Sequence, residues 1–282
     1  MRRRCHASHA RPEVAIDTFS NTDSATKRMR PRIVVVMPAY NAAATLARTY
    51  ADMPKDAFDE VLLVDDASQD NTADLATQMG LTVLRHERNM GYGANQKTCF
   101  RYALDHGAGI IVMLHPDYQY DPKILLSITA PILDGTADVV LASRMLGDPL
   151  KGGPLQNGMP FFKYVANKVL TWIQNRVLGT YFSEFHTGYR AFSRQALEAI
   201  PFDRNSDDFV FDNQIIVQLL MAECRFKETP VVTNYHAEAS SVDLWTSIRY
   251  GFGVMGTIVE AFRQRAGSAH HPRFEVKTIR RN

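Results

Sequence analysis

Side chains that bind divalent cations follow one apolar run of the sequence. His115, Asp117 and Gln119 come directly after Ile110–Leu114, a run without polar residues. Imidazole nitrogens and carboxylate or amide oxygens hold divalent cations, and in an extended segment these three positions face one side. The segment therefore predicts a cation site that could bind a diphosphate. An alternative is that His115 only packs or hydrogen-bonds, which leaves Asp117 as the sole ligand.

Two adjacent carboxylates end another apolar run. Asp65 and Asp66 follow Glu60–Val64. Such a pair can cap the next turn through hydrogen bonds from its own backbone. If the two runs are parallel strands, their carboxyl ends share one edge of a sheet, where an acid can accept from a nucleobase N–H or a ribose hydroxyl. Both interpretations stay open.

Strands and helices alternate along the chain. The expected strands are Ile33–Met37, Glu60–Val64, Leu81–Arg85, Ile110–Leu114, Asp138–Ala142, Gly188–Ser193 and Arg225–Val232. The expected helices are Ala42–Tyr50, Thr72–Met79, Gly93–His106, Asp121–Leu133, Pro160–Leu178, Phe211–Ala222 and Val242–Arg265. This alternation predicts an α/β fold whose central sheet is mainly parallel and flanked by helices.

Composition limits the class of protein. With 45% hydrophobic and 22% charged residues, the 282-residue chain can bury a core. Its three cysteines are scattered, which favours neither a disulfide framework nor a zinc site. No apolar run approaches the roughly 20 residues that span a bilayer, and no secretory signal is present. We therefore expect a cytoplasmic protein, soluble or peripheral on the inner face of the cell membrane.

Charge is concentrated at the two ends. Residues 1–32 carry eight Arg and Lys against three acids, and residues 263–282 carry six against one. The net charge is only +2, so the region between them is acidic. The ends are either solvated tails or contacts with an anionic surface. We expect phospholipid rather than nucleic acid, because nucleic-acid binding would rest on the tails alone.

Three parts of the chain are expected. Residues 1–31 form a disordered basic segment, residues 32–241 the α/β domain, and residues 242–282 an amphipathic helix with a basic tail. Residues 147–160, rich in Gly and Pro, predict a mobile binding loop or lid. The apolar stripe of the last helix suits a core contact, a homodimer contact or an interfacial membrane helix.

Five motifs carry a resemblance to a known family. They are VVVMPAYNAAATL, EVLLVDDASQDNT, NMGYGANQKTCFRYAL, IIVMLHPDYQYDP and EFHTGYRAFSR. In this order they resemble family 2 glycosyltransferases of the GT-A fold, the nucleotide-diphospho-sugar transferase fold. The closest subgroup contains dolichyl-phosphate mannose synthases and polyprenyl-phosphate sugar transferases. The resemblance covers about residues 32–241.

The resemblance implies roles in donor binding. His115-Pro116-Asp117 stands where the family has its Asp-x-Asp metal motif, so the implied cofactor is Mg²⁺ or Mn²⁺. Imidazole in place of a carboxylate shifts preference toward Mn²⁺. The glycines near residue 92 would let the chain pass close to the sugar nucleotide, and Arg144 would contact phosphate. The implied nucleotide-sugar-binding residues are Pro38, Ala39, Tyr40, Asp65 or Asp66, Gly91, Gly93, Lys97 and Arg144.

The second half would form the acceptor wall and complete the catalytic set of Asp117, Asp212 and Arg190. Arg190 would either bind an anionic acceptor or pair with an acid such as Glu184. Asp212, near a helix N-terminus, is a candidate base, although capping would explain it equally well. Gln214 stands where the family usually has Glu and cannot take a proton. This change favours an acceptor that is already an anion.

We therefore expect an inverting, metal-dependent glycosyltransferase. It would move a sugar from a nucleotide-diphospho-sugar to a polyprenyl phosphate or another glycan or lipid acceptor. An alternative is a catalytically weak sugar-nucleotide-binding or scaffold protein, because of His115 and Gln214. A nucleotidyltransferase is disfavoured because its Gly-rich loop is absent after the first strand. A dehydrogenase is disfavoured because Gln96 replaces the third glycine of the dinucleotide fingerprint.

Overall fold

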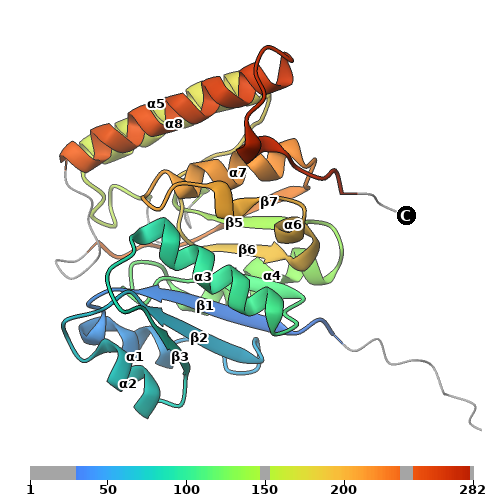
Figure 1. The fold of residues 1–282 in the computed structure, drawn as a ribbon. Helices are drawn as coiled ribbons and strands as arrows, with labels where there is room; N and C mark the ends of the chain where they lie inside the picture. The colour runs from blue at the N-terminus through green and yellow to red at the C-terminus, as the bar shows by residue number, and fades with distance from the viewer. Residues whose placement is uncertain (1–29, 147–152, 236–243, 280–282) are drawn as a thin grey trace, which may run out of the picture. The chain divides into compact units, whose positions relative to one another are not determined.

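One mixed sheet organises the protein. The computed structural model describes residues 30–146, 153–235 and 244–279, and Pro31–Asn282 forms one compact unit. In the described part of this unit the sheet has seven strands in the order β3-β2-β1-β4-β6-β5-β7 (Figure 1). The strands are β1 (Ile33–Ala39), β2 (Glu60–Asp65), β3 (Thr82–Arg85), β4 (Ile110–Met113), β5 (Val139–Ser143), β6 (Arg190–Ser193) and β7 (Phe226–Pro230).

The sheet is mainly parallel, as predicted. β1 pairs in parallel with β2 and β4, β2 with β3, and β5 with β7. β6 lies antiparallel between β4 and β5. Every residue of β1, β4 and β5 is buried, which is why these strands are continuous apolar runs.

Helices cover both faces of the sheet. One face packs against α1, α2 and α4, and the other against α3, α6 and α7. The short helix α6 was not expected from the sequence; the Ser193 hydroxyl accepts from the Ala196 N–H at 3.2 Å and caps it. The helices are α1 (Ala43–Ala51), α2 (Thr72–Gln78), α3 (Tyr92–Asp105), α4 (Leu125–Leu133), α5 (Phe161–Leu178), α6 (Arg194–Glu198), α7 (Phe211–Met221) and α8 (Leu244–Arg265).

The long helices α5 and α8 pack side by side as a further layer beside α7 (Figure 1). In the described part of the chain no helix is long and apolar enough to cross a membrane. Residues 1–29, 147–152, 236–243 and 280–282 lie outside the described residues. Most of the segment expected to be disordered (residues 1–31), the first six residues of the Gly- and Pro-rich loop expected at 147–160 and the first two of the helix expected at 242–265 therefore lie outside the described residues.

The segment after α8, which was expected only as a basic tail, packs against the domain. Phe274 is buried in the core, and the Lys277 N–H donates to the Ala199 carbonyl at 2.8 Å. The buried Gln218 of α7 donates its amide to the Arg273 carbonyl at 2.8 Å. Residues 272–279 are thus part of the same compact unit.

The strand order places a crevice at the carboxyl end of the sheet. From β1 the chain proceeds to β2 and β3 on one side, and β4 then pairs with the other side of β1. The connections leaving β1 and β4 diverge at such a switch point and leave room for a ligand. Tyr40 and His115 follow these two strands.

Candidate functional site

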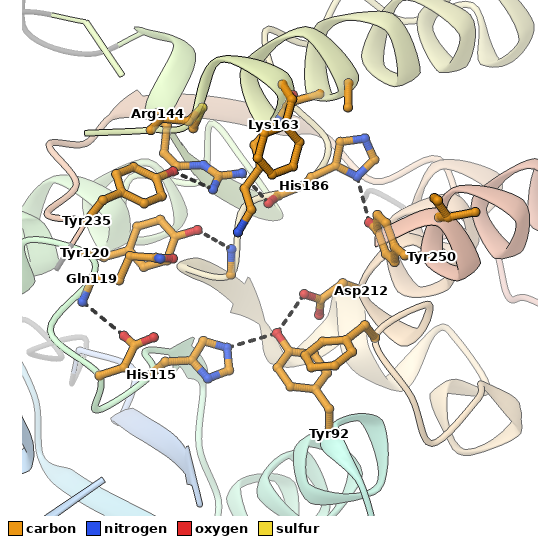
Figure 2. A pocket seen from close by; sticks show the side chains of 18 residues that line it. Tyr92, His115, Gln119, Tyr120, Arg144, Lys163, His186, Asp212, Tyr235 and Tyr250 are labelled. Atoms are coloured by element: carbon orange, nitrogen blue, oxygen red, sulfur yellow. Dashed lines mark hydrogen bonds between the residues drawn. The ribbon is translucent and has the colours of Figure 1, made fainter. Parts of the chain in front are cut away.

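A cavity of about 450 Å³ lies next to the end of β4. Five of the expected site residues line it (Figure 2), and Arg190, outside the lining, forms an ion pair with one of them, Asp212, at 3.1 Å. The lining residues are Tyr92, His115, Asp117, Gln119, Tyr120, Arg144, Met159, Phe162, Lys163, Ala166, Asn167, His186, Gly188, Phe209, Asp212, Tyr235, Ile248 and Tyr250.

The segment after β4 presents its polar side chains to the cavity. His115, Asp117 and Gln119 are partly exposed and line it, as their alternate spacing predicts. The Asp117 carboxylate accepts from the backbone N–H of Gln119 at 3.0 Å, which leaves its other oxygen for a ligand. Nowhere in the described ranges do three or more His, Cys, Asp or Glu side chains form a metal cluster. The donor set fits a cation that substrate phosphates and water complete, as they commonly do for Mg²⁺.

A buried polar network supports this wall. Asp212 accepts from the Tyr92 hydroxyl at 2.8 Å, the Gln96 amide at 2.9 Å and Arg190 Nη1 at 3.1 Å. The Asp212 side chain does not cap α7. Arg190 pairs with Asp212, not with Glu184, the acid named as its possible partner from the sequence. Burial and the Asp212 carboxylate raise the pKa of Tyr92 well above its ordinary value.

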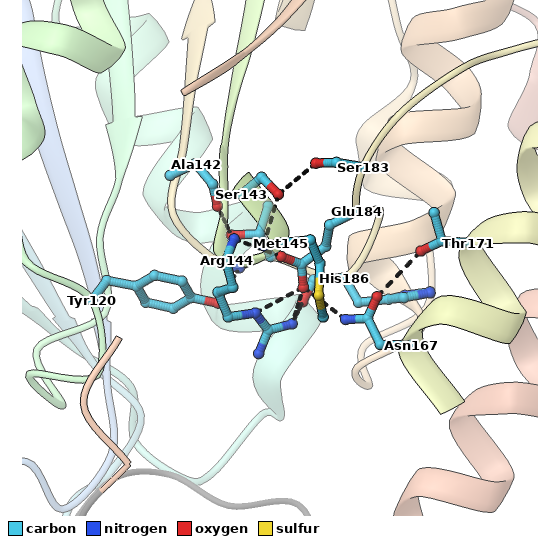
Figure 3. A network of polar contacts seen from close by, with 12 residues as sticks. Tyr120, Ala142, Ser143, Arg144, Met145, Asn167, Thr171, Ser183, Glu184 and His186 are labelled. Atoms are coloured by element: carbon cyan, nitrogen blue, oxygen red, sulfur yellow. Dashed lines mark hydrogen bonds and ion pairs between the residues drawn. The ribbon is translucent and has the colours of Figure 1, made fainter. Parts of the chain in front are cut away.

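Glu184 pairs instead with Arg144 (Figure 3). The Glu184 carboxylate accepts from Arg144 Nε at 2.7 Å, from Nη2 and from the backbone N–H at 2.8 Å. Burial opposes ionisation, but Arg144 outweighs it, so the pKa of Glu184 lies below its ordinary value. Arg144 also donates to the Tyr235 hydroxyl and the His186 carbonyl. One N–H of Nη1 therefore remains for the expected phosphate contact.

Two further cavity residues were not identified from the sequence. Lys163, in the first turn of α5, points into the cavity (Figure 2), and burial and Arg144 lower its pKa. It has no carboxylate partner among the described residues. The His186 ring bonds the Tyr250 hydroxyl at 2.7 Å, and burial lowers its pKa to about 4, so it is neutral at pH 7. A lysine opening a helix after a Gly- and Pro-rich loop was the available signal for Lys163.

The two tandem acids have different environments. Asp66 accepts from the His86 ring at 2.7 Å and from the backbone N–H groups of Met90 and Gly91 at 2.8 and 3.0 Å. It thereby fixes the loop before α3. Asp65 caps the Ser68 N–H with one oxygen, while its buried Oδ1 has no partner. A buried acceptor without a donor suits a ligand N–H or hydroxyl.

The glycines of the expected donor site serve a different contact. A Cβ on Gly93 would lie 2.3 Å from the Ser206 carbonyl oxygen, and one on Gly91 would lie 2.7 Å from that of Asp207. The close approach is therefore to residues 206–207. Lys97 pairs with Asp207 at 2.7 Å. None of these three residues lines the cavity.

The expected nucleoside-pocket residues follow β1. Pro38 and Ala39 are buried in the strand, whereas Tyr40 is 48% exposed. The Asn95 amide donates to the Ala39 and Val64 carbonyls at 3.4 and 3.0 Å, which ties the ends of β1 and β2 together. The partnerless Asp65 Oδ1 belongs to the same pair of strand ends.

The sequence matches a known family over most of this architecture. Residues 34–200 match the model described as Glycosyl transferase family 2, and they make up more than half of the chain. The chain belongs to this family. The GT-A fold and the glycosyltransferase class predicted from the motifs are thereby confirmed.

Two of the three relatives compared below have names that include a lipid phosphate, and the third is uncharacterized. The UDP-N-acetylglucosamine–dolichyl-phosphate N-acetylglucosaminyltransferase of Methanococcus voltae is 24% identical over 79% of this chain and 92% of its own. The polyprenol monophosphomannose synthase of Mycolicibacterium smegmatis is 29% identical over 63% and 68%. An uncharacterized protein of Methanocaldococcus jannaschii is 29% identical over 82% and 92%.

Solved structures show the same fold. Mannosyl-3-phosphoglycerate synthase from Rubrobacter xylanophilus gives a TM-score of 0.64 at 17% identity, covering 86% of this chain and 77% of its own. Glucosyl-3-phosphoglycerate synthase from Mycobacterium tuberculosis, in complex with Mn²⁺, UDP and glucosyl-3-phosphoglycerate, gives 0.60 at 16%, covering 82% and 80%.

Proposed function

We propose that this glycosyltransferase transfers a sugar, with inversion, from a nucleotide-diphospho-sugar to a polyprenyl phosphate. The observation that carries the proposal is the arrangement of charge in the cavity. His115 lies on one side of the cavity and the cations Lys163 and Arg144 on the other (Figure 2), and Asp117 lines the same cavity two residues after His115. The first group suits a cation with a diphosphate, and the second suits a separate anion.

The donor would lie along the ends of β1, β2 and β4. Asp65 Oδ1 would accept from the base or ribose, and Tyr40 would flank the nucleoside. Asp117, with His115 and Gln119, would hold Mg²⁺ or Mn²⁺, which neutralises charge on the departing diphosphate. His115 and Asp117 would thus fix the leaving group against the sheet edge.

The acceptor would be an anion held by Lys163 and the free N–H of Arg144. A phosphate oxygen is already nucleophilic near neutral pH, so the reaction needs positioning more than a base. Asp212 already accepts three hydrogen bonds, from Tyr92, Gln96 and Arg190, so its carboxylate is engaged within the protein. We infer that Asp212 organises the cavity wall. Attack from the side opposite the diphosphate inverts the anomeric centre.

The apolar chain of a polyprenyl phosphate would extend from the cavity along the surface of the protein. Exposed apolar side chains follow each other at helical spacing along α5 and α8: Phe161, Val165, Val169 and Trp172, and Phe252, Met255, Val259 and Phe262. The same helices carry six cations and one acid, Glu260. Apolar stripes with basic neighbours suit the headgroup region of an anionic bilayer. Phe162, Lys163 and Tyr250 of these helices also line the cavity. We therefore place the membrane contact on this helix pair, on the inner face of the cell membrane.

Transfer of labelled sugar tests the reaction. A thermal-shift panel of UDP-, GDP- and dTDP-sugars with Mg²⁺ and Mn²⁺ would first identify the donor, because a bound ligand stabilises by mass action. Transfer to polyprenyl phosphate, but not to the polyprenol that lacks phosphate, is expected. Donor binding without transfer to any acceptor would overturn the proposal and favour a sugar-nucleotide-binding scaffold.

A matched pair of lysines tests the acceptor end. Lys163→Met should lower kcat/KM for polyprenyl phosphate by about 10- to 100-fold, the range for a lost charge-assisted hydrogen bond of 1.5–3 kcal/mol. Donor affinity by calorimetry should stay unchanged. Lys168→Met, on the same helix outside the cavity, should leave donor affinity unchanged and lower kcat/KM far less than Lys163→Met does. Equal effects of the two variants would refute an anion site at Lys163.

Vesicle flotation tests the membrane contact. The protein should float with phosphatidylglycerol vesicles and less with phosphatidylcholine. Phe252→Glu should reduce flotation, whereas Leu126→Glu, at an exposed position on α4, should not. A dimer in light scattering that Phe252→Glu dissociates, without vesicle binding, would assign the surface to a second copy of the chain.

A further inference from the structure

Two tyrosine hydroxyls in the cavity accept hydrogen bonds from groups that only donate. The Tyr120 hydroxyl accepts from the Gly188 backbone N–H at 3.0 Å, and the Tyr235 hydroxyl accepts from Arg144 Nη1 at 3.1 Å. A backbone N–H and a guanidinium accept nothing in return, and each tyrosine hydroxyl has one proton of its own. Both protons are uncommitted, because the described residues offer no acceptor for either of them.

A short backbone pairing brings the two tyrosines together. Tyr120 forms an antiparallel bridge with Thr233, and the Asn234 N–H donates to the Gln119 carbonyl at 2.8 Å. Tyr235 follows directly on the second of these paired segments, and both tyrosine side chains line the cavity. The position of each hydroxyl is therefore set by backbone contacts as well as by its own hydrogen bond.

The two hydroxyls add to a set of hydrogen-bond donors at one end of the cavity. Figure 2 shows them at the same end as Lys163 and Arg144. Burial lowers the pKa of Arg144, but Glu184, Tyr120 and Tyr235 outweigh it and hold that pKa well above its ordinary value. The Lys163 ammonium contributes three N–H groups and Arg144 its remaining one. The Glu184 carboxylate is engaged by Arg144 and does not line the cavity.

We propose that Tyr120 and Tyr235 bind the terminal phosphate of the acceptor, and that this donor set prefers a phosphate monoester to a phosphate diester. The inference rests on the function proposed above. A monoester has three terminal oxygens and about two negative charges near neutral pH, whereas a diester has two such oxygens and one charge. Four donor groups, two of them cationic, therefore match the monoester better.

This preference has a consequence for product release. In the transfer, an oxygen of the acceptor phosphate forms a bond to the anomeric carbon of the sugar. The bond from that carbon to the diphosphate oxygen breaks, and the nucleoside diphosphate leaves with the electron pair. The acceptor monoester thereby becomes a diester, with one terminal oxygen and one negative charge fewer. The donor set therefore binds the product more weakly than the acceptor.

Calorimetry with short prenyl phosphates tests the site without requiring sugar transfer. At pH 7 geranyl phosphate should bind about 10-fold or more tightly than geranyl methyl phosphate, its diester. Tyr120→Phe and Tyr235→Phe should each weaken binding of geranyl phosphate by about 10- to 100-fold, the range for a lost hydrogen bond to a charged group. The ratio of monoester to diester affinity should fall in both variants, which the loss of a merely structural contact would not change.

Tyr189→Phe is the matched control. Its buried ring contacts the ring of Tyr120, and its hydroxyl donates to the Pro122 carbonyl at 3.5 Å, outside the cavity. This variant should keep both the affinity for geranyl phosphate and the preference for the monoester.

The outcomes separate this inference from the proposed function. Unchanged affinity for geranyl phosphate in either Tyr120→Phe or Tyr235→Phe, or equal binding of monoester and diester, would overturn the inference even if sugar transfer proceeds. A lack of geranyl phosphate binding to the unaltered protein would also overturn it. Conversely, selective binding of the monoester by a protein that transfers no sugar would support the site and reject the reaction.

Discussion

The Arg144–Glu184 pair predicts a large stability difference from a single amide substitution. Glu184 is fully buried and the Arg144 side chain is 12% exposed, so Glu184→Gln leaves a buried guanidinium without its counter-charge. Losing one partner of a buried pair costs about 3–5 kcal/mol. Arg144 keeps its bonds to the Tyr235 hydroxyl and the His186 carbonyl, at 3.1 and 2.7 Å, which places the expected loss near the lower end.

Urea denaturation at pH 7 measures the effect. With a slope of about 2–3 kcal/mol per molar urea, the midpoint should fall by roughly 1–2 M. Glu198→Gln is the control, since Glu198 bonds Arg194 at 2.7 Å with both side chains exposed, and should cost at most about 0.5 kcal/mol. The folded pKa of Glu184 is lowered, so its stabilisation is present above about 4.5, the ordinary value, and disappears as the pH falls through the folded pKa. Equal midpoints for Glu184→Gln and Glu198→Gln would refute the assigned pair.

Three further outcomes follow from single sites. The pKa of His186 is lowered to about 4, so below pH 6.5 the unfolded chain binds a proton that the folded chain does not. The free energy of unfolding should therefore fall between pH 6.5 and about 4. Urea midpoints measured over this range should fall less steeply in His186→Gln. Asp65→Asn should weaken nucleotide binding in calorimetry by about 10- to 100-fold, because Asp65 Oδ1 has no partner within the protein. Asp66→Asn should instead mainly lower the free energy of unfolding, by about 1–3 kcal/mol, because Asp66 bonds His86. Gly93→Ala should destabilise by about 1–3 kcal/mol because its Cβ meets the Ser206 carbonyl, whereas Gly256→Ala, with open space on α8, should stabilise by about 0.5–1 kcal/mol in thermal unfolding.

The strand ends could be predicted because burial on both faces leaves a direct trace in the sequence. An apolar run that stops at a polar residue marks the edge of the sheet, so His115, Asp117 and Asp65 could be placed before any coordinates. The mainly parallel sheet could also be predicted, because apolar strands alternate along the sequence with segments long enough to form helices. The sequence can thus show which residues lie at the end of a buried strand, because this depends only on neighbouring residues.

The ion pairs could not be predicted in the same way. The sequence alone does not show whether Glu184 or Asp212 is the ion-pair partner of Arg190. The partner depends on where β6, which begins with Arg190, lies in the sheet, and β6 is inserted antiparallel between β4 and β5. The glycines at positions 91 and 93 indicate a close approach but do not identify the approaching group, which is the backbone of residues 206–207. The burial of Phe274 could likewise not be predicted, because residues 263–282 are mostly basic and the surface that covers Phe274 is formed by α7.

The docking of residues 272–279 onto α7 has a consequence for the order of synthesis. Gln218 has its amide oxygen bonded to Asn205 and its amide nitrogen to carbonyls of Pro201 and Arg273. While a ribosome is still adding residues 266–279, the Arg273 acceptor does not exist and the neighbouring apolar surface stays open. A nascent chain at this stage exposes the apolar surface that Phe274 later covers, and exposed apolar surface of this kind favours aggregation until residues 272–279 are added.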